Sequence, residues 1–166
     1  MKRWVMLMVV LCALAGAGSV FADATSVGLG LSAGVAFPQG DTPSIASTDW
    51  QPSFNWGFYV NIPLISTFHI TPSSELYRFN NQNATDIDIA FKFIVPLGMF
   101  DIYAGVATGL TAIQNILPPH VAVLGGAAFR LVSNLDFFTQ VKYTVLFQGS
   151  QNMSILHVTA GILFAF

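Results

Sequence analysis

Three histidines, His69, His120 and His157, are the residues of this chain best suited to acid–base catalysis or metal binding. His157 has a hydroxyl two positions later, at Thr159. A hydrolytic triad needs a nucleophile, a histidine that activates it and a carboxylate that orients the histidine. Here the hydroxyl belongs to a threonine and no Asp or Glu follows it, so we expect no catalytic residue. We interpret the histidines as polar residues that line or rim an interior.

Metal, cofactor and nucleic-acid sites are not indicated either. Cys12 is the only cysteine, no Cys/His cluster has metal-ligand spacing, and no glycine-rich phosphate loop precedes a helix. We therefore expect no metal and no cofactor. Beyond residue 22 the formal net charge falls from -2 to -4, because Lys2 and Arg3 are lost. Binding to nucleic acid needs clustered basic side chains, so we expect no nucleic-acid partner.

The remaining charged side chains are few, and most fall on one face of segments in which polar and apolar residues alternate. Opposite charges in a narrow interior should pair, because an isolated buried charge is costly. We predict a polar network in the lumen that fixes the strand register, with a selectivity or gating network as the alternative. Its predicted members are Glu75, Asp88, Lys92, Asp101, Arg130 and Lys142.

Alternation with a period of two is the signal that positions these residues, because it places successive side chains on opposite faces of a β-strand. In residues 26–37 one face is Val, Leu, Ala and Phe, and the other is Ser, Gly and Ala. Eight such segments are predicted, at residues 26–37, 53–62, 67–79, 86–95, 99–112, 121–132, 137–148 and 154–166.

The segment at 67–79 is the least regular. Phe68 and Ile70 define its apolar face, and on that parity Arg78 falls on the apolar side while Glu75 falls on the other. Two explanations stay open. A β-bulge near residues 72–74 would reset the register, or Arg78 lies at the membrane edge, where a charge costs only about 0 to 1 kcal/mol.

Composition and side-chain size decide which solvent surrounds these strands. The chain is 54% hydrophobic and 8% charged, which is far from a water-soluble domain. The bulky apolar residues share one face and the small or polar residues share the other, as in a closed eight-stranded cylinder with lipid outside. Short links at 63–66, 96–98 and 133–136 alternate with the longer gaps, which places both chain ends on the periplasmic side. We predict an all-β, eight-stranded antiparallel up-and-down transmembrane β-barrel over residues 23–166.

The N-terminal residues predict export. Lys2 and Arg3 precede an apolar run over residues 4–17, and small or β-branched residues lead to Ala22. This is typical of a signal peptide, and we expect residues 1–22 to be cleaved. A retained membrane anchor is the alternative, but the run is shorter than the roughly 20 residues that cross a bilayer.

Three sequence stretches resemble strands of small outer-membrane β-barrel proteins of the OmpX-, OmpW- and OmpA-barrel-like families. They are Tyr103-Ala-Gly-Val-Ala-Thr-Gly109, Gly125-Gly-Ala-Ala-Phe-Arg-Leu131 and the strand from Val158 to Phe166. The resemblance implies a place in the outer membrane of a Gram-negative-type envelope, with outer-membrane lipid around it. It also implies that Phe164 and Phe166 form a signal read by the barrel-assembly machinery, which would be a transient partner.

These observations favour a non-enzymatic integral outer-membrane protein with a structural or surface-interaction role, acting as a monomer. The alternative is a narrow channel or lateral route for small or hydrophobic solutes, as resemblance to OmpW would imply. Ile94, Leu124 and Leu163 are inward apolar residues compatible with that route. A wide pore is not expected, because side chains fill the interior of an eight-stranded barrel. Among the connecting loops, Trp50 is the predicted exposed anchor.

Overall fold

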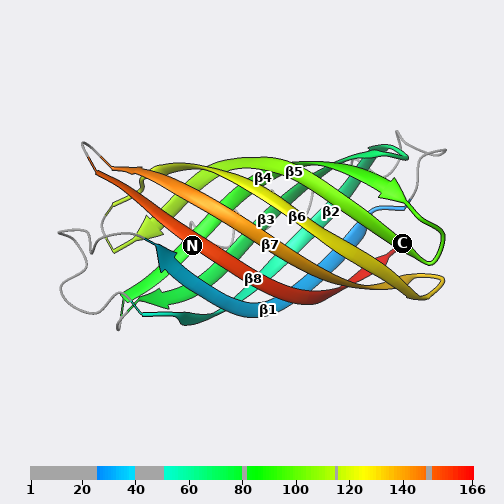
Figure 1. The fold of residues 1–166 in the computed structure, drawn as a ribbon, viewed down its shortest axis with the longest axis horizontal. Coiled ribbons are helices and arrows are strands. Elements are labelled where there is room, and N and C mark those ends of the chain that lie inside the picture. Colours follow the sequence, from blue (N-terminus) through cyan, green and yellow to red (C-terminus); the bar gives the residue numbers. More distant parts are fainter. Residues whose placement is uncertain (1–25, 40–50, 80–81, 115, 149–150) are drawn as a thin grey trace, which may run out of the picture.

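The computed structural model describes residues 26–39, 51–79, 82–114, 116–148 and 151–166. These residues form one closed antiparallel barrel in which each strand pairs with its neighbours in the chain (Figure 1). The predicted fold class is confirmed. The expected signal peptide and Trp50 lie outside the described residues. The strands are β1 (Gly28–Gln39), β2 (Ser53–Ile65), β3 (Phe68–Phe79), β4 (Gln82–Pro96), β5 (Phe100–Ile113), β6 (Pro119–Val132), β7 (Leu135–Gln148) and β8 (Gln151–Ala165).

Pairing of the first strand with the last closes the barrel. Strands β1 and β8 are in register from Gly28 opposite Ala165 to Gln39 opposite Ser154. Closure removes the free sheet edge, whose unpaired N–H and C=O groups hydrocarbon cannot solvate.

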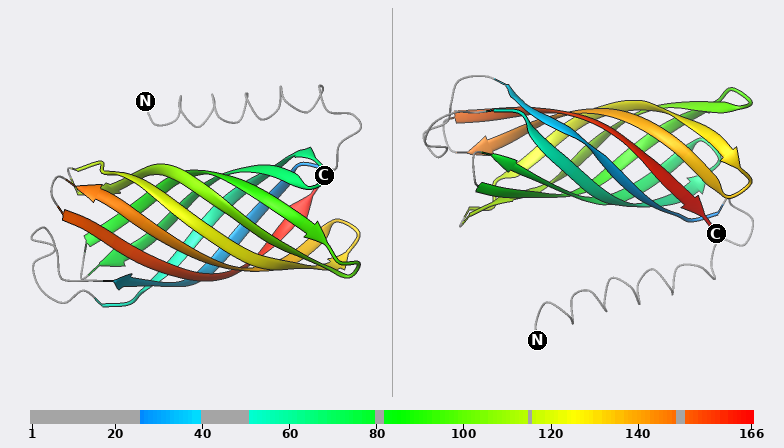
Figure 2. Two further views of the ribbon diagram at one scale, coloured as in Figure 1. Left: turned by 45° about the horizontal axis from the view of Figure 1, so that its top comes forward. Right: turned by 90° about the horizontal axis from the view of Figure 1, so that it is seen from below.

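The strands run obliquely around the barrel in every view (Figure 2). They have 12 to 15 residues, more than the about 9 to 11 that a tilted strand needs to cross a membrane. Among the described residues, no helix is long and apolar enough to span a bilayer.

Large apolar side chains cover the outside of the barrel. Leu31, Phe54, Val123 and Ile162 are 47 to 65% exposed, and each follows an inward neighbour that is small or polar. A water-soluble monomer rarely exposes an apolar patch larger than a few hundred Å². The outer surface is therefore suited to lipid hydrocarbon, and the barrel is a transmembrane fold.

The two ends of the barrel differ in their connections. At one end, which we call the terminal end, the start of β1 and the end of β8 lie beside the tight turns after β2, β4 and β6 (Figure 2). Gly98 in the β4–β5 turn has φ of 88°, a conformation that favours glycine. The opposite end, which we call the loop end, carries the connections after β1, β3, β5 and β7.

Several strands extend further toward the loop end than alternation predicts. Strand β4 begins at Gln82, β6 at Pro119 and β8 at Gln151, whereas the predicted starts are residues 86, 121 and 154. The added residues are mostly polar, so an apolar–polar pattern does not mark them, yet their backbones continue the ladder. Residues 80–81 and 149–150 are left as the connections there, which are shorter than predicted.

The register of β3 decides between the two explanations for Arg78. Pairing of β3 with β4 is continuous from Phe68 opposite Phe93 to Phe79 opposite Gln82, so there is no bulge at residues 72–74. Arg78 points outward, is exposed and lies one residue from the loop end of its strand. Its charge therefore sits at the membrane edge, where the cost is small. The register shifts that the described strands do contain lie at Pro63/Ile65 and Arg130/Val132, near the terminal end.

Candidate functional site in the barrel interior

An apolar cluster lies in the interior near the loop end, and we call it the apolar plug. All of its members are at most 5% exposed. They come from the loop-end portions of the strands, so they meet across the lumen. These side chains therefore leave little of their surface accessible to water. The members are Ala36, Tyr77, Ala84, Ile113, Leu146, Met153 and Ile155.

A cluster of charged side chains, which we call the ionic layer, lies next to the plug toward the terminal end. Lys142 reaches across the lumen from β7 and places its Nζ atom 2.7 Å from Asp88 Oδ2 on β4. The same Nζ atom is 3.0 Å from Glu75 Oε2 and 3.6 Å from Asp86 Oδ2. All four side chains are at most 2% exposed. One ammonium group thus joins three carboxylates from two neighbouring strands.

Hydrogen bonds hold the second oxygen of each carboxylate. Tyr77 and Thr111 donate to Asp86 Oδ1 at 2.7 and 2.8 Å. The Tyr59 hydroxyl donates to Glu75 Oε1. His120 Nε2 contacts Asp88 Oδ1. Such contacts fix which oxygen of each carboxylate faces Lys142.

The chain Thr111, His120 and Asp88 has the connectivity of a catalytic triad. Thr111 Oγ1 lies 2.8 Å from His120 Nδ1, and His120 Nε2 contacts Asp88 Oδ1. However, Thr111, His120 and Asp88 are at most 2% exposed. A nucleophile must reach its substrate, and the Thr111 hydroxyl donates to Asp86 inside the barrel. This chain of contacts therefore lies among buried side chains, where it stabilises the interior.

Glycine on an adjacent strand leaves space that the ionic layer occupies. Gly109 on β5 lies opposite Asp88 on one side and His120 on the other. A Cβ atom added to Gly109 would lie 2.0 Å from the Ile87 carbonyl oxygen and 2.8 Å from Asp88 Oδ1. The small residues of the inward face therefore allow large polar side chains to pack inside a narrow barrel.

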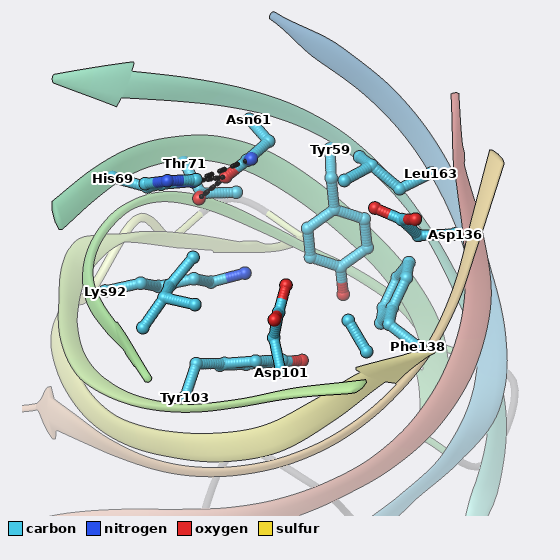
Figure 3. Close-up of a pocket in the computed structure, with 12 residues that line it drawn as sticks. Tyr59, Asn61, His69, Thr71, Lys92, Asp101, Tyr103, Asp136, Phe138 and Leu163 are labelled. Atoms are coloured by element: carbon cyan, nitrogen blue, oxygen red, sulfur yellow. Dashed lines mark hydrogen bonds between the residues drawn. The ribbon is translucent and has the colours of Figure 1, made fainter. Parts of the chain in front are cut away.

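A small pocket occupies the interior at the terminal end, with a volume of about 90 Å³. Lys92 and Asp101 both point into it (Figure 3). Lys92 Nζ lies 4.9 Å from the centre of the Tyr103 ring and 5.7 Å from that of Tyr59, within the range of cation–π contacts. Phe138 packs its ring edge-to-face on Tyr59, 5.6 Å away.

One side of this pocket is lined by three polar side chains, those of Asn61, His69 and Thr71. Asn61 Nδ2 lies 2.9 Å from His69 Nδ1, and Thr71 donates to Asn61 Oδ1 at 3.1 Å (Figure 3). These side chains satisfy one another, while Ile94 and Leu163 add apolar surface to the lining. The pocket is thus a shallow vestibule that ends at the aromatic rings around Lys92.

The six predicted network residues fall into three places. Glu75, Asp88 and Lys142 meet in the ionic layer. Lys92 and Asp101 line the vestibule. Arg130 belongs to neither group, because it lies two residues before the end of β6, at the terminal end of the barrel. Its side chain is 62% exposed there, and its Nε atom is 3.7 Å from Asp136 Oδ1.

Sequence reasoning omits several residues that the structure places at the centre of the ionic layer. Alternation puts Asp86 on the inward face, yet the predicted network leaves it out, although it contacts Lys142, Tyr77 and Thr111. His120 lies before the predicted start of its strand, so alternation does not assign its inward orientation. For Asp86 the usable signal is parity, since it alternates with Asp88 on the same face.

Phe164 and Phe166, the predicted assembly signal, lie at the terminal end. Their rings meet edge-to-face with centroids 5.0 Å apart, and they are 41 and 67% exposed. The backbone N–H of Phe166 donates to the carbonyl of Val27 at 3.0 Å, so the pairing with the first strand continues beyond Ala165.

No protein-family model matches this chain, and no curated protein sequence matches it. Its fold is similar to that of Neisserial surface protein A, with 13% identity, 84% of this chain and 97% of the other covered, and a TM-score of 0.70. The outer membrane protein OprG from Pseudomonas aeruginosa shares 10% identity over 86% of this chain and 98% of its own, with a TM-score of 0.55.

A de novo designed transmembrane β-barrel is similar as well, with 13% identity, 87% and 98% coverage and a TM-score of 0.53. At these identities the likeness is one of fold. The predicted resemblance to small outer-membrane barrels is confirmed at that level.

Proposed function

We propose that this protein is a non-enzymatic integral outer-membrane barrel with a structural or surface-interaction role and an interior that is closed to solutes. The observation that carries the proposal is the stacking of the apolar plug on the ionic layer. Leu146 and Ile155 in the plug are 0% exposed, and Lys142 crosses the lumen beneath them. A solute would have to displace both, which separates charges in a poorly solvated space.

The competing function is a narrow channel, and the vestibule around Lys92 and Asp101 is the feature that favours it. The vestibule is small, at about 90 Å³, and the ionic layer lies between it and the loop end. A lateral route would need a break in the wall. Each of the eight strands pairs with both of its neighbours, and the described register shifts are confined to the terminal end.

Conductance of the purified protein separates the two functions. The protein is reconstituted into planar bilayers and into liposomes loaded with small sugars and amino acids. We expect no unitary conductance and no uptake above that of protein-free liposomes, with a trimeric porin as the positive control. Reproducible single-channel steps, or selective uptake of any solute, would contradict a closed interior and establish the channel.

We propose that the protein is located in the outer membrane. The apolar wall requires a membrane, and the signal-peptide pattern over residues 1–22 indicates export. In a Gram-negative host we expect the processed protein in the outer-membrane fraction. Its insertion there would use the barrel-assembly machinery, so depletion of that machinery should reduce the folded form. Recovery from the inner membrane or the periplasm would contradict this proposal.

A further inference from the structure

The ionic layer has more fixed negative charge than positive charge. Glu75, Asp86 and Asp88 are at most 2% exposed, and Lys142 is the lysine that contacts all three. Three carboxylates therefore share one lysine, and the other basic side chains that contact them are the imidazoles of His120 and His157. Buried charges are stable only when they are paired or bind a metal. A further cation beside Glu75 and Asp86 would therefore add compensating positive charge.

Three buried atoms of the layer lack a hydrogen-bond partner, and they face one another. They are Glu75 Oε2, Asp86 Oδ2 and His157 Nε2, in side chains that are 0 to 1% exposed. Lys142 Nζ makes an ionic contact with two of them, at 3.0 Å from Glu75 Oε2 and 3.6 Å from Asp86 Oδ2, and meets part of their need for a partner. Native interiors leave few polar atoms without a hydrogen bond, and an unplaced ion is one recognised cause.

The separations of these groups suit a metal ion. His157 Nε2 lies 3.8 Å from Asp86 Oδ2, and His157 Nδ1 lies 3.3 Å from Glu75 Oε2. One ligand atom from each residue lies within 4.8 Å of the others. Metal–ligand bonds of about 2.0 to 2.2 Å place tetrahedral ligands about 3.4 Å apart. The ligand atoms, which lie within 4.8 Å of one another, therefore have to draw closer together to close on an ion.

Asn55 supplies the outer contact that a ligating histidine requires. Its amide nitrogen is 3.1 Å from His157 Nδ1, while its Oδ1 atom is buried without a partner. Amide oxygen and nitrogen are exchangeable by a flip. After a flip, the Nδ1–H group donates to Asn55 Oδ1, and the lone pair on Nε2 is free to bind a metal. A hydrogen bond of this kind fixes the tautomer of metal-bound histidines.

We propose that Glu75, Asp86 and His157 bind one divalent transition-metal ion, of the Zn²⁺ or Mn²⁺ class, inside the barrel. One imidazole and two carboxylates form the ligand set that such ions accept. The positive charge of the ion would offset the carboxylates that share Lys142. Lys142 keeps its shortest contact, at 2.7 Å, with Asp88, which is not a ligand. His120 is not a ligand, because both of its ring nitrogens already contact Thr111 and Asp88.

Metal content after refolding tests the proposal. The full-length processed protein is unfolded in urea with a chelator, refolded in detergent with Zn²⁺ or Co²⁺, desalted and measured by mass spectrometry of the metal. We expect about one ion per chain for wild type. His157→Gln and Asp86→Asn should lose at least tenfold of this occupancy. His69→Gln is the matched control, because His69 lies in the vestibule, and it should keep the ion.

Folding is checked in every sample by heat-modifiable gel migration, so that metal loss is read only from folded barrels. Folded wild type without retained metal overturns the proposal. Equal occupancy in wild type and folded His157→Gln also overturns it. Where the variants do not fold, the Co²⁺ spectrum of wild type decides. Intense d–d absorption bands of four-coordinate Co²⁺ support the site, and their absence overturns it.

Discussion

Lys142 Nζ lies 2.7 Å from Asp88 Oδ2 although 54 residues separate the two in the chain. The contact crosses the lumen, since Lys142 is on β7 and Asp88 is on β4. Each residue has other partners in the layer, which are Glu75 and Asp86 for the lysine and His120 for the aspartate. The ionic layer therefore ties together opposite walls of the barrel in a way that hydrogen bonds between adjacent strands cannot.

Removal of the lysine tests how much that tie stabilises the fold. Lys142→Met leaves three buried carboxylates without their shared cation, and breaking a buried pair costs about 3 to 5 kcal/mol. We expect the free energy of unfolding to fall by that amount in urea titrations followed by tryptophan fluorescence in detergent micelles. Arg130→Met is the control, because that exposed pair at the terminal end contributes about 0 to 1 kcal/mol. Equal effects of the two substitutions would show that the ionic layer is not a stabilising tie.

Two neighbouring glycines on β6 allow a sharper comparison of packing. A Cβ atom on Gly126 would lie 2.1 Å from the Thr139 carbonyl oxygen and 2.6 Å from the Tyr103 ring, whereas on Gly125 its nearest contact is 3.5 Å away. We expect Gly126→Ala to cost about 1 to 3 kcal/mol through overpacking. Gly125→Ala should change stability by less than about 0.5 kcal/mol. Urea midpoints measured side by side check both, and a larger loss for Gly125→Ala would contradict the inward placement of Gly126.

Most of the fold follows from the alternation of side chains. Alternation identifies eight strands, their inward faces and the short turns, because a period of two is a local property of the chain. Alternation is less informative about where the strands end at the loop end of the barrel. Residues such as Gln82 and Gln151 extend strands beyond the apolar band, where both faces are polar. Alternation also leaves the orientation of the Arg78 side chain undecided, because a bulge and a membrane-edge position give the same local pattern.

The contents of the lumen are harder to predict for a physical reason. Parity says that a side chain points inward, but its depth depends on the stagger of strands around the whole barrel. Arg130 and Lys142 are both inward by parity, yet Arg130 is 62% exposed at the terminal end and Lys142 is 2% exposed in the ionic layer. The proposed metal ligands come from β3, β4 and β8, so no short motif marks them.

The apolar plug offers a separate test of the interior. Leu146→Ala removes a fully buried side chain that packs with Met153 and Ile155, and such truncations cost about 2 to 5 kcal/mol. We expect a stability loss in that range. We also expect no gain of conductance, because the ionic layer remains in place beneath the plug. Single-channel recordings of the folded variant check the second point, and open-channel steps would show that the plug alone closes the barrel.

The outer wall makes a prediction that depends on depth in the membrane. Val123 and Leu131 are on the same strand and are similarly exposed, at 58 and 57%. Val123 is nearer the middle of β6, whereas Leu131 is one residue from its terminal end. An arginine costs about 2 to 4 kcal/mol at the bilayer midplane and about 0 to 1 kcal/mol near the interface.

We therefore expect Val123→Arg to destabilise the barrel in lipid vesicles by at least about 2 kcal/mol more than Leu131→Arg does. The measurement is reversible unfolding in guanidinium with vesicles of one defined thickness. Arg78→Leu serves as the reference for a native charge at the loop-end interface, and it should leave stability within about 1 kcal/mol of wild type. If both arginine substitutions cost the same, residues 123 and 131 do not differ in depth, and β6 does not cross the membrane with Val123 near the midplane and Leu131 at the interface.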